Sequence, residues 1–264
     1  MSTAHPARRV LFGEHSTQAP AIARFIDRTR FDPSFADLAT ADFAPFDLVV
    51  PLSVVQIDAA RGANADGTRR AVLPSAALVA LCDDKLACNQ WLIERGFAAH
   101  VPDLLGSEPD SYPYIRKSRH GNFGAGCVMV RDAAAAAALE PIDEGSFHQR
   151  AVVGADEYVL HLVRIDGQIR FQLCYRYDMG TPLAVRGGSE GAKAVVPADA
   201  TDVLPLCADI LDAMAYEGTC CFNYKLEDGQ AQILEINPRF GGSLVGEVSA
   251  YLQAHVEALE PIAP

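Results

Sequence analysis

The apolar and polar positions of the first fifty residues predict a short strand–helix–strand unit. Residues 9–13, with Val10, Leu11 and Phe12 as the apolar part, fit a short strand that ends at Gly13, and residues 20–28 fit a helix. The mostly apolar run 46–52 is typical of a strand in a sheet that is covered on both faces. This order of elements indicates a short N-terminal α/β domain, which we place at residues 1–78.

Helix signals follow in three places. Residues 75–81 fit one helix, and a second starts after Asp83 or Asp84, either of which can cap it, and ends at Gly96. Asp132 is placed to cap a third helix over the alanine run 133–138, because alanine has the highest helix propensity.

A hairpin is predicted between the second and third helices. Residues 113–118 form a strand with Lys117 near its end, and residues 127–130 return as a second strand. The glycine-rich segment 120–126 connects them, so we expect a mobile tip.

The rest of the chain is typical of an antiparallel sheet with one helix, and Asp-Gly pairs mark its hairpin turns. The expected strands are 147–153, 157–164, 168–177, 220–226 and 231–237, with turns at 166–167 and 228–229 and a helix over 203–216. The predicted fold class is therefore α+β, with a small α/β beginning.

Charge and composition narrow the classes of function. The chain has 264 residues with 22 Lys and Arg against 34 Asp and Glu, a net charge of −12, which argues against a nucleic-acid partner. A nucleotide remains compatible, because a metal ion and a few cations can hold phosphates. No segment resembles an export signal or the roughly 20 apolar residues of a membrane span. The seven cysteines lack the spacing of a metal site, so we expect reduced thiols, a cytoplasmic protein and no membrane partner.

The most informative segment is Glu235-Ile236-Asn237-Pro238-Arg239. In a strand, Glu235 and Asn237 share one face, where a carboxylate and an amide oxygen can bind a hard divalent cation. Pro238 ends the strand, and Arg239 follows at a position where a guanidinium can hold a phosphate or a developing anion. The alternative is an edge strand with solvated polar residues.

This segment, on the second strand of a late hairpin, resembles the metal-binding signature of the ATP-grasp superfamily, in particular its carboxylate–amine ligases and the branch of carbamoyl phosphate synthase and biotin carboxylase. The resemblance implies an ATP-grasp domain over residues 79–264 with a lid at about 112–150. It implies metal binding by Glu235 and Asn237, and catalytic roles for Lys117 and Arg239. The ATP-binding residues that it implies are Lys85, Lys117, Arg150, Ala151, Val152 and Glu157, with adenine at 150–152 and ribose at Glu157.

One departure from the family concerns a further metal ligand, which members carry on the strand paired with Glu235. Counting back across the turn places this position at Cys221, a poor ligand for Mg²⁺. Asn223 and Lys225 lie on the same face, so Asn223 or water can substitute. The N-terminal unit is also shorter than the family's preceding domain, which leaves the substrate-binding part undefined.

The glycine-rich segment has two interpretations. His120, Gly121 and Gly124 can contact the ATP phosphates as part of a lid, although no Gly-Lys-Ser/Thr follows as in a P-loop. The same residues also fit a flexible turn with a solvated histidine. Arg176, Arg186 and Arg239 are the candidates for contacts to an anionic substrate, and an exposed turn is the alternative for Arg186.

The resemblance implies an enzyme that uses ATP and Mg²⁺, or Mn²⁺, to activate a carboxylate as an acyl phosphate and to join it to an amine. Its expected partners are a small carboxylate and a small amine, and a homodimer is suggested because family members commonly dimerise. The alternatives are a small-molecule kinase on the same fold and a non-catalytic ATP-binding module.

Overall fold

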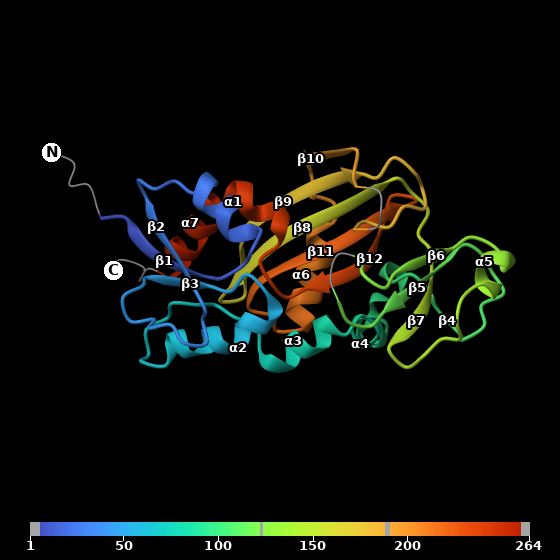
Figure 1. The fold of residues 1–264 in the computed structure, drawn as a ribbon, viewed down its shortest axis with the longest axis horizontal. Helices are drawn as coiled ribbons and strands as arrows, with labels where there is room; N and C mark the ends of the chain where they lie inside the picture. The colour runs from blue at the N-terminus through green and yellow to red at the C-terminus, as the bar shows by residue number, and fades with distance from the viewer. Residues whose placement is uncertain (1–5, 122–123, 188–190, 260–264) are drawn as a thin grey trace.

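The computed structural model describes residues 6–121, 124–187 and 191–259. Figure 1 shows three sheets in a row along the longest axis: a small N-terminal sheet, a large central sheet and a third sheet from the green part of the chain. Within the described residues these sheets have three, five and four strands. The arrangement confirms the predicted α+β fold class.

The N-terminal sheet is parallel and has the strand order β2-β1-β3. Its strands are β1 (Arg8–Gly13), β2 (Phe31–Ala36) and β3 (Leu48–Val50), and helix α1 (Gln18–Phe25) connects the first two. The strands expected at 9–13 and 46–52 and the helix between them are therefore confirmed. Strand β2 was not predicted, because it contains Pro33, a residue that a sheet tolerates only at an edge such as this one.

The central sheet is antiparallel throughout its described strands and has the order β10-β9-β8-β11-β12. Its strands are β8 (Asp156–Ile165), β9 (Gln168–Asp178), β10 (Ala194–Ala198), β11 (Gly218–Glu227) and β12 (Gln230–Asn237). Four of them were predicted within a few residues. Strand β10 was not predicted; it is a short edge strand that carries Pro197.

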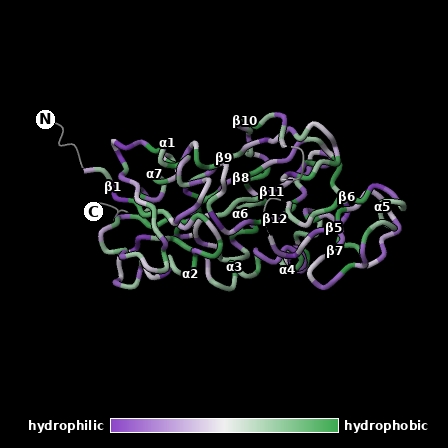
Figure 2. Tube along the Cα trace, viewed as in Figure 1, coloured by the Kyte–Doolittle hydropathy of each residue, from purple (hydrophilic) through white to green (hydrophobic). Residues whose placement is uncertain are grey.

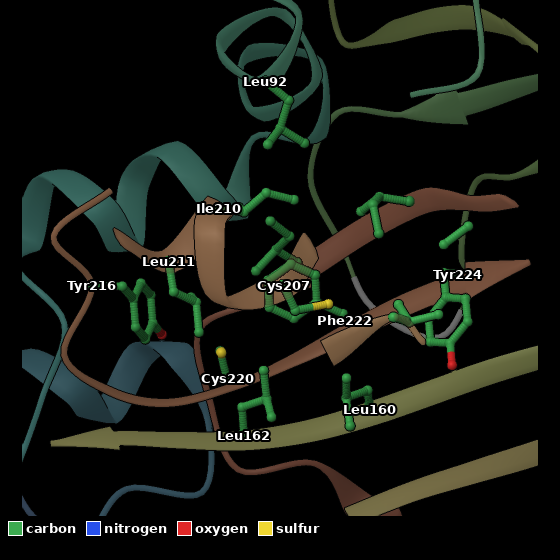
Figure 3. Close-up of a cluster of buried hydrophobic side chains, with 14 of the residues drawn as sticks. Leu92, Leu160, Leu162, Cys207, Ile210, Leu211, Tyr216, Cys220, Phe222 and Tyr224 are labelled. Atoms are coloured by element: carbon green, nitrogen blue, oxygen red, sulfur yellow. The ribbon is translucent and has the colours of Figure 1, made fainter. Parts of the chain in front are cut away.

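One face of the central sheet packs against helices. Leu160, Leu162, Cys220 and Phe222 alternate toward α6 (Leu204–Ala213) and are almost fully buried there (Figure 3). Helices α3 (Ala76–Asp83) and α4 (Lys85–Leu92) contact the same sheet at β12 and extend this apolar cluster. Because neighbouring side chains along a strand point to opposite faces, the other residues of these strands face away from the helices.

The opposite face of the sheet is covered only at one end. There, helix α7 (Val248–Leu259) packs on β8 and β9 beside α1, and Figure 1 shows it in red next to the blue N-terminal unit. Val163 and Phe171 of the sheet share one apolar cluster with Phe12 of the N-terminal unit. Helix α7 was not predicted. The remaining part of this face lies toward the third sheet.

The third sheet has the order β4-β7-β5-β6 and is antiparallel. It consists of β4 (Leu104–Leu105), β5 (Tyr114–Ser118), β6 (Val128–Val130) and β7 (Ser146–Arg150), followed in the picture by α5 (Ala133–Ala137) at the far end (Figure 1). The predicted hairpin β5–β6 and the helix capped by Asp132 are confirmed. Residues 122 and 123 of the hairpin tip lie outside the described residues.

Helices α3 (Ala76–Asp83) and α4 (Lys85–Leu92) lie where helices were predicted, and Asp84 is one of the two caps expected for the second of them. The side chain of Ser75 accepts a hydrogen bond from the backbone of Leu78, and that of Asp84 accepts one from Ala87. The short helix α2 (Ile57–Ala60) precedes them. Gly96 adopts a φ of 93°, which favours glycine, and breaks the helical path after α4.

Hydrophobic segments concentrate inside the molecule, and hydrophilic ones are frequent along its outer loops (Figure 2). No helix among the described residues has both the length and the apolar character needed to cross a lipid bilayer.

Candidate functional site

A pocket lies between the uncovered part of the central sheet and the third sheet. Its lining combines residues from both sheets, from the segment that joins them, and from two loops. The lining includes Lys85, Lys117, Gly121, Gly124, Arg150, Ala151, Val152, Glu157, Arg186, Asn223, Lys225 and Glu235. Most of the site residues expected from the sequence therefore meet in one place, although they are spread over 150 positions of the chain.

The hairpin β11–β12 forms the floor of the pocket, and its register differs from the one expected. Tyr224 pairs with Ile233, whereas Asn223 pairs with Glu235, so Leu234 is an extra residue in β12. A ladder without the bulge would place Phe222 opposite Glu235; with the bulge, Asn223 lies opposite Glu235 and Cys221 lies opposite Asn237. The expectation that placed Cys221 at that position is corrected: an amide faces the carboxylate.

Lys117 reaches the floor from β5 and binds at the bulge. Its Nζ donates hydrogen bonds to the backbone oxygen of Leu234 at 3.2 Å and to Oε1 of Gln149 at 2.8 Å. Burial lowers the pKa of Lys117, and the nearby Glu235 carboxylate opposes this shift. A buried ammonium with only neutral oxygen partners retains a strong attraction for an anion.

Lys85 is the first residue of α4, and the cap of that helix determines its position. Asp84 caps the helix and also forms an ion pair with Arg119. The Nζ of Lys85 donates to the backbone oxygen of Gly121 at 2.6 Å and lies 3.8 Å from Oε2 of Glu235. Two lysines from distant segments thus flank one carboxylate.

The segment between β7 and β8 forms the opposite end of the pocket. Glu157, the second residue of β8, is buried beside this segment and accepts a hydrogen bond from Nε of Arg186 at 2.7 Å. Burial raises the pKa of Glu157, whereas Arg186 acts to lower it. The guanidinium of Arg186 also lies over the ring of Tyr177, 4.8 Å from its centre.

Two further lining residues, to which the sequence pattern assigns no role, make polar contacts in the pocket. Lys225 donates to the backbone oxygen of Gly154 at 2.7 Å and to that of Val152 at 3.4 Å, and burial lowers its pKa. Gln149 holds Lys117, as described above. Strand alternation from Glu235 already places Lys225 on the pocket face, but its partners on another segment leave no signal in the sequence.

Asn237 and Arg239 lie beyond the pocket lining, at the end of β12. Nη2 of Arg239 is 3.5 Å from Oδ1 of Asn237, and Asn237 is buried. His161 lies in register with Cys221, and its Nε2 is 2.7 Å from Oγ of Ser243. Burial, followed by the charges of Arg239 and Arg186, lowers the pKa of His161 to about 3, so the ring is neutral near pH 7.

The structure does not bring Arg176 and His120 into this arrangement. Arg176 pairs with Tyr158, a residue that packs against the helix-covered face, and its guanidinium contacts Asp156 at 3.1 Å. His120 is exposed and lies 3.3 Å from Asp83. Alternation along β9 places Arg176 on the face away from the pocket. The sequence does not show which face each residue of that strand occupies, because its register depends on the neighbouring strands.

The oxygen donors near Glu235 fit a magnesium ion. Oδ1 of Asn223 is buried and has no hydrogen-bond partner, and Asn237 supplies a second amide. Carboxylate and amide oxygens are the donors that Mg²⁺ prefers, with water completing its coordination. Among the described residues, no group of three His, Cys, Asp or Glu offers another metal site.

Several solved structures resemble the fold of this chain over nearly its full length. D-alanine–D-alanine ligase from Bacillus anthracis is 12% identical with a TM-score of 0.62, and the match covers 96% of this chain and 97% of that one. Biotin carboxylase from Campylobacter jejuni is 16% identical with a TM-score of 0.66, covering 97% and 72%. These proteins share one fold. The chain has the ATP-grasp fold.

Other matches agree with the ATP-grasp fold. L-amino acid ligase from Bacillus licheniformis is 18% identical with a TM-score of 0.62, and the match covers 98% of this chain and 75% of that one. No family model and no curated protein matches the sequence. At these identities, the similarity shows only that the chain has the same fold, and its chemistry depends on its own residues.

Proposed function

We propose that this chain is an ATP- and Mg²⁺-dependent ligase that activates a carboxylate as an acyl phosphate and joins it to an amine. The observation that carries the proposal is the convergence of Lys85 and Lys117 on Glu235 at the floor of one pocket. Two ammonium groups beside one carboxylate leave a surplus of positive charge, which suits the phosphates of a nucleotide.

The two ends of the pocket support an assignment of the nucleotide's parts. The backbone at 150–152 lines the pocket, while the side chain of Arg150 turns to Glu227 at 2.8 Å. We therefore assign the adenine contacts to backbone groups of this segment. Glu157 is the candidate for the ribose hydroxyls, and a nucleotide then has to compete with Arg186 for its carboxylate.

Glu235, Asn237 and Asn223 are the residues that would hold Mg²⁺. When bound, such an ion withdraws charge from phosphate oxygens and so favours phosphoryl transfer. Gly121 and Gly124 lie where their backbone can approach the phosphates. Lys117 and Lys85 stabilise the negative charge of the transferred group from fixed positions.

The proposed reaction needs no nucleophile from the protein. A substrate carboxylate attacks the γ-phosphorus, ADP leaves, and an amine then displaces phosphate from the acyl phosphate. Arg239 lies two residues beyond Asn237 and can orient the carboxylate or the developing anion. Positioning and electrostatics account for the catalysis, as in other phosphoryl transfers.

Amino acids are the first substrates to test, because D-alanine–D-alanine ligase and L-amino acid ligase are among the similar structures. The experiment measures ADP release for pairs of amino acids and small carboxylic acids, and mass spectrometry identifies the product. We expect ADP to form only when an acid and an amine are both present, together with a new amide. ADP release with the acid alone and a stable phosphorylated product would indicate a kinase.

A substitution ties this activity to the proposed site. E235A is expected to abolish ADP release, whereas E140A, which changes an exposed glutamate outside the pocket, should leave it intact. Equal turnover in both variants would reject the assignment. Tight MgATP binding without ADP formation for any pair would instead support a non-catalytic module.

A further inference from the structure

The ligand set around Glu235 is poor in negative charge. Asn223 faces it across the hairpin and Asn237 follows it on the strand, so a cation here meets one carboxylate and two neutral amides. Glu157, the other acidic residue of the pocket lining, already forms an ion pair with Arg186. Among the described residues, no group of three His, Cys, Asp or Glu is placed to hold a metal ion.

Both oxygens of Glu235 already have partners in the protein. Oε1 accepts a short hydrogen bond from Nδ2 of Asn223, and Oε2 lies 3.8 Å from Nζ of Lys85. A cation that binds Glu235 has to displace or share these partners. Oδ1 of Asn223 is buried and unpartnered, so it is available to a cation without any such exchange.

The surroundings of Glu235 carry a surplus of positive charge. Lys117 is buried and donates to the backbone oxygen of Leu234, the residue directly before Glu235. Lys85 approaches from the other side. In a partly buried site, two ammonium groups repel a dication more than one carboxylate attracts it, because charges interact more strongly there than in water. The phosphates of a nucleotide reverse this balance.

We propose that this site takes up one divalent cation per chain, and only together with the phosphates of the nucleotide, an inference that rests on the proposed function. The nucleotide supplies the negative charge that the protein lacks. A second cation finds no free carboxylate, since Asn223 offers only a neutral amide opposite Glu235 and Glu157 is paired with Arg186.

Binding of Mn²⁺, followed by electron paramagnetic resonance and by equilibrium dialysis, tests this inference without reference to activity. The probes are Mn²⁺ alone and Mn²⁺ with β,γ-imido-ATP, each with the full chain. We expect the wild-type chain to leave the signal of free Mn²⁺ unchanged when nucleotide is absent, and to retain one Mn²⁺ per chain when the analogue is present.

Two substitutions are expected to uncouple the cation from the nucleotide. N223D adds a carboxylate opposite Glu235, and K85M removes the nearest ammonium. Each should raise the affinity for Mn²⁺ alone by about tenfold or more, which corresponds to one altered unit charge at short range in a partly screened site. Q168E adds the same charge at the exposed start of β9, outside the pocket, and should change nothing.

The outcomes separate the two proposals. Binding of Mn²⁺ to the wild-type chain without nucleotide, as tight as in N223D, would overturn this inference while leaving the proposed function intact. Two Mn²⁺ per chain in the nucleotide complex would overturn it as well. Failure of Mn²⁺ and the analogue to bind together would overturn both proposals. If N223D fails to fold, as judged by circular dichroism, K85M decides the question.

Discussion

At the scale of single residues, Lys117 shows how the fold prepares an anion site. The bulge at Leu234 frees a backbone oxygen that accepts from Nζ, and Gln149 provides the second acceptor. Both contacts are neutral, so they fix the ammonium without cancelling its charge. Sequence reasoning identified the lysine, because it precedes a glycine-rich segment. It could not identify the bulge, because a single extra residue in a strand leaves the hydrophobic pattern almost unchanged.

Loss of the Lys117 ammonium should strongly impair the proposed reaction. We expect K117M to lower the rate of ADP formation by roughly 10²–10³, the effect of removing one preorganised donor. K193M, which removes an exposed lysine outside the pocket, serves as the control. Steady-state kinetics with the best substrate pair would measure both, and equal rates would remove Lys117 from the site.

Buried histidines couple stability to pH. Burial, with a smaller contribution from Arg69, lowers the pKa of His255 to about 4 from an ordinary value of 6.5. The unfolded chain therefore binds more protons than the folded chain between these values, and the free energy of unfolding falls as the pH falls. His161, whose pKa is about 3, acts in the same direction.

We expect H255F to remove one of these contributions. From pH 6.5 down to about 4, the wild-type free energy of unfolding should fall by about 1.4 kcal/mol per pH unit more steeply than that of H255F. Urea unfolding at several pH values in this window measures the difference. Parallel curves would show that His255 ionises normally in the folded chain.

At the scale of elements, two loops meet over the pocket. Gly124 of the β5–β6 loop adopts a φ of 66°, and a Cβ there would lie 2.4 Å from the backbone oxygen of Arg186. The contact joins the glycine-rich loop to the segment whose guanidinium holds Glu157. The sequence indicated glycines near phosphates but could not show that the partner would be a loop sixty residues away.

An alanine at this glycine should loosen the cover of the pocket. G124A adds both backbone strain and the clash, so we expect roughly tenfold weaker binding of β,γ-imido-ATP with Mg²⁺. Isothermal titration calorimetry measures it, with G106A as the control, because nothing lies within 4 Å of a Cβ at Gly106. Unchanged affinity in G124A would mean that the loop contact does not contribute to binding.

Elements with strong local signals were predictable, and those fixed by distant partners were not. Asp84 begins its helix as expected, since a cap acts within four residues. Strand β10 and helix α7 were missed, because their positions depend on contacts with β9 and the N-terminal unit. The face of β9 on which Arg176 lies also depends on pairing with a distant strand, so it could not be predicted from the sequence.

At the scale of the whole molecule, the first and last elements share a core. Phe12 and Ile22 of the N-terminal unit join Val163 of the central sheet and Leu252 of α7 in one buried cluster. The sequence divides the chain at residues 78 and 79, a boundary that stays a prediction. A shared core argues that the two parts depend on each other for stability, because removing either exposes apolar surface.

A fragment of residues 79–264 should therefore be less stable than the same residues in the full chain. We expect the full chain to unfold in one transition, and the fragment to bind a hydrophobic dye and to melt at a lower temperature. Calorimetry and dye fluorescence measure both. A fragment that melts at the temperature of the full chain would establish residues 79–264 as an independent domain.

We propose above all that the segments around residues 85, 117 and 235 enclose a nucleoside triphosphate together with its metal ion. A crystal structure with β,γ-imido-ATP and Mn²⁺, phased to show the anomalous signal of manganese, tests it most directly. The predicted result is a triphosphate beside Lys85 and Lys117, with a single manganese peak at Glu235 and Asn237. A nucleotide bound elsewhere, or a manganese peak away from Glu235, would contradict it.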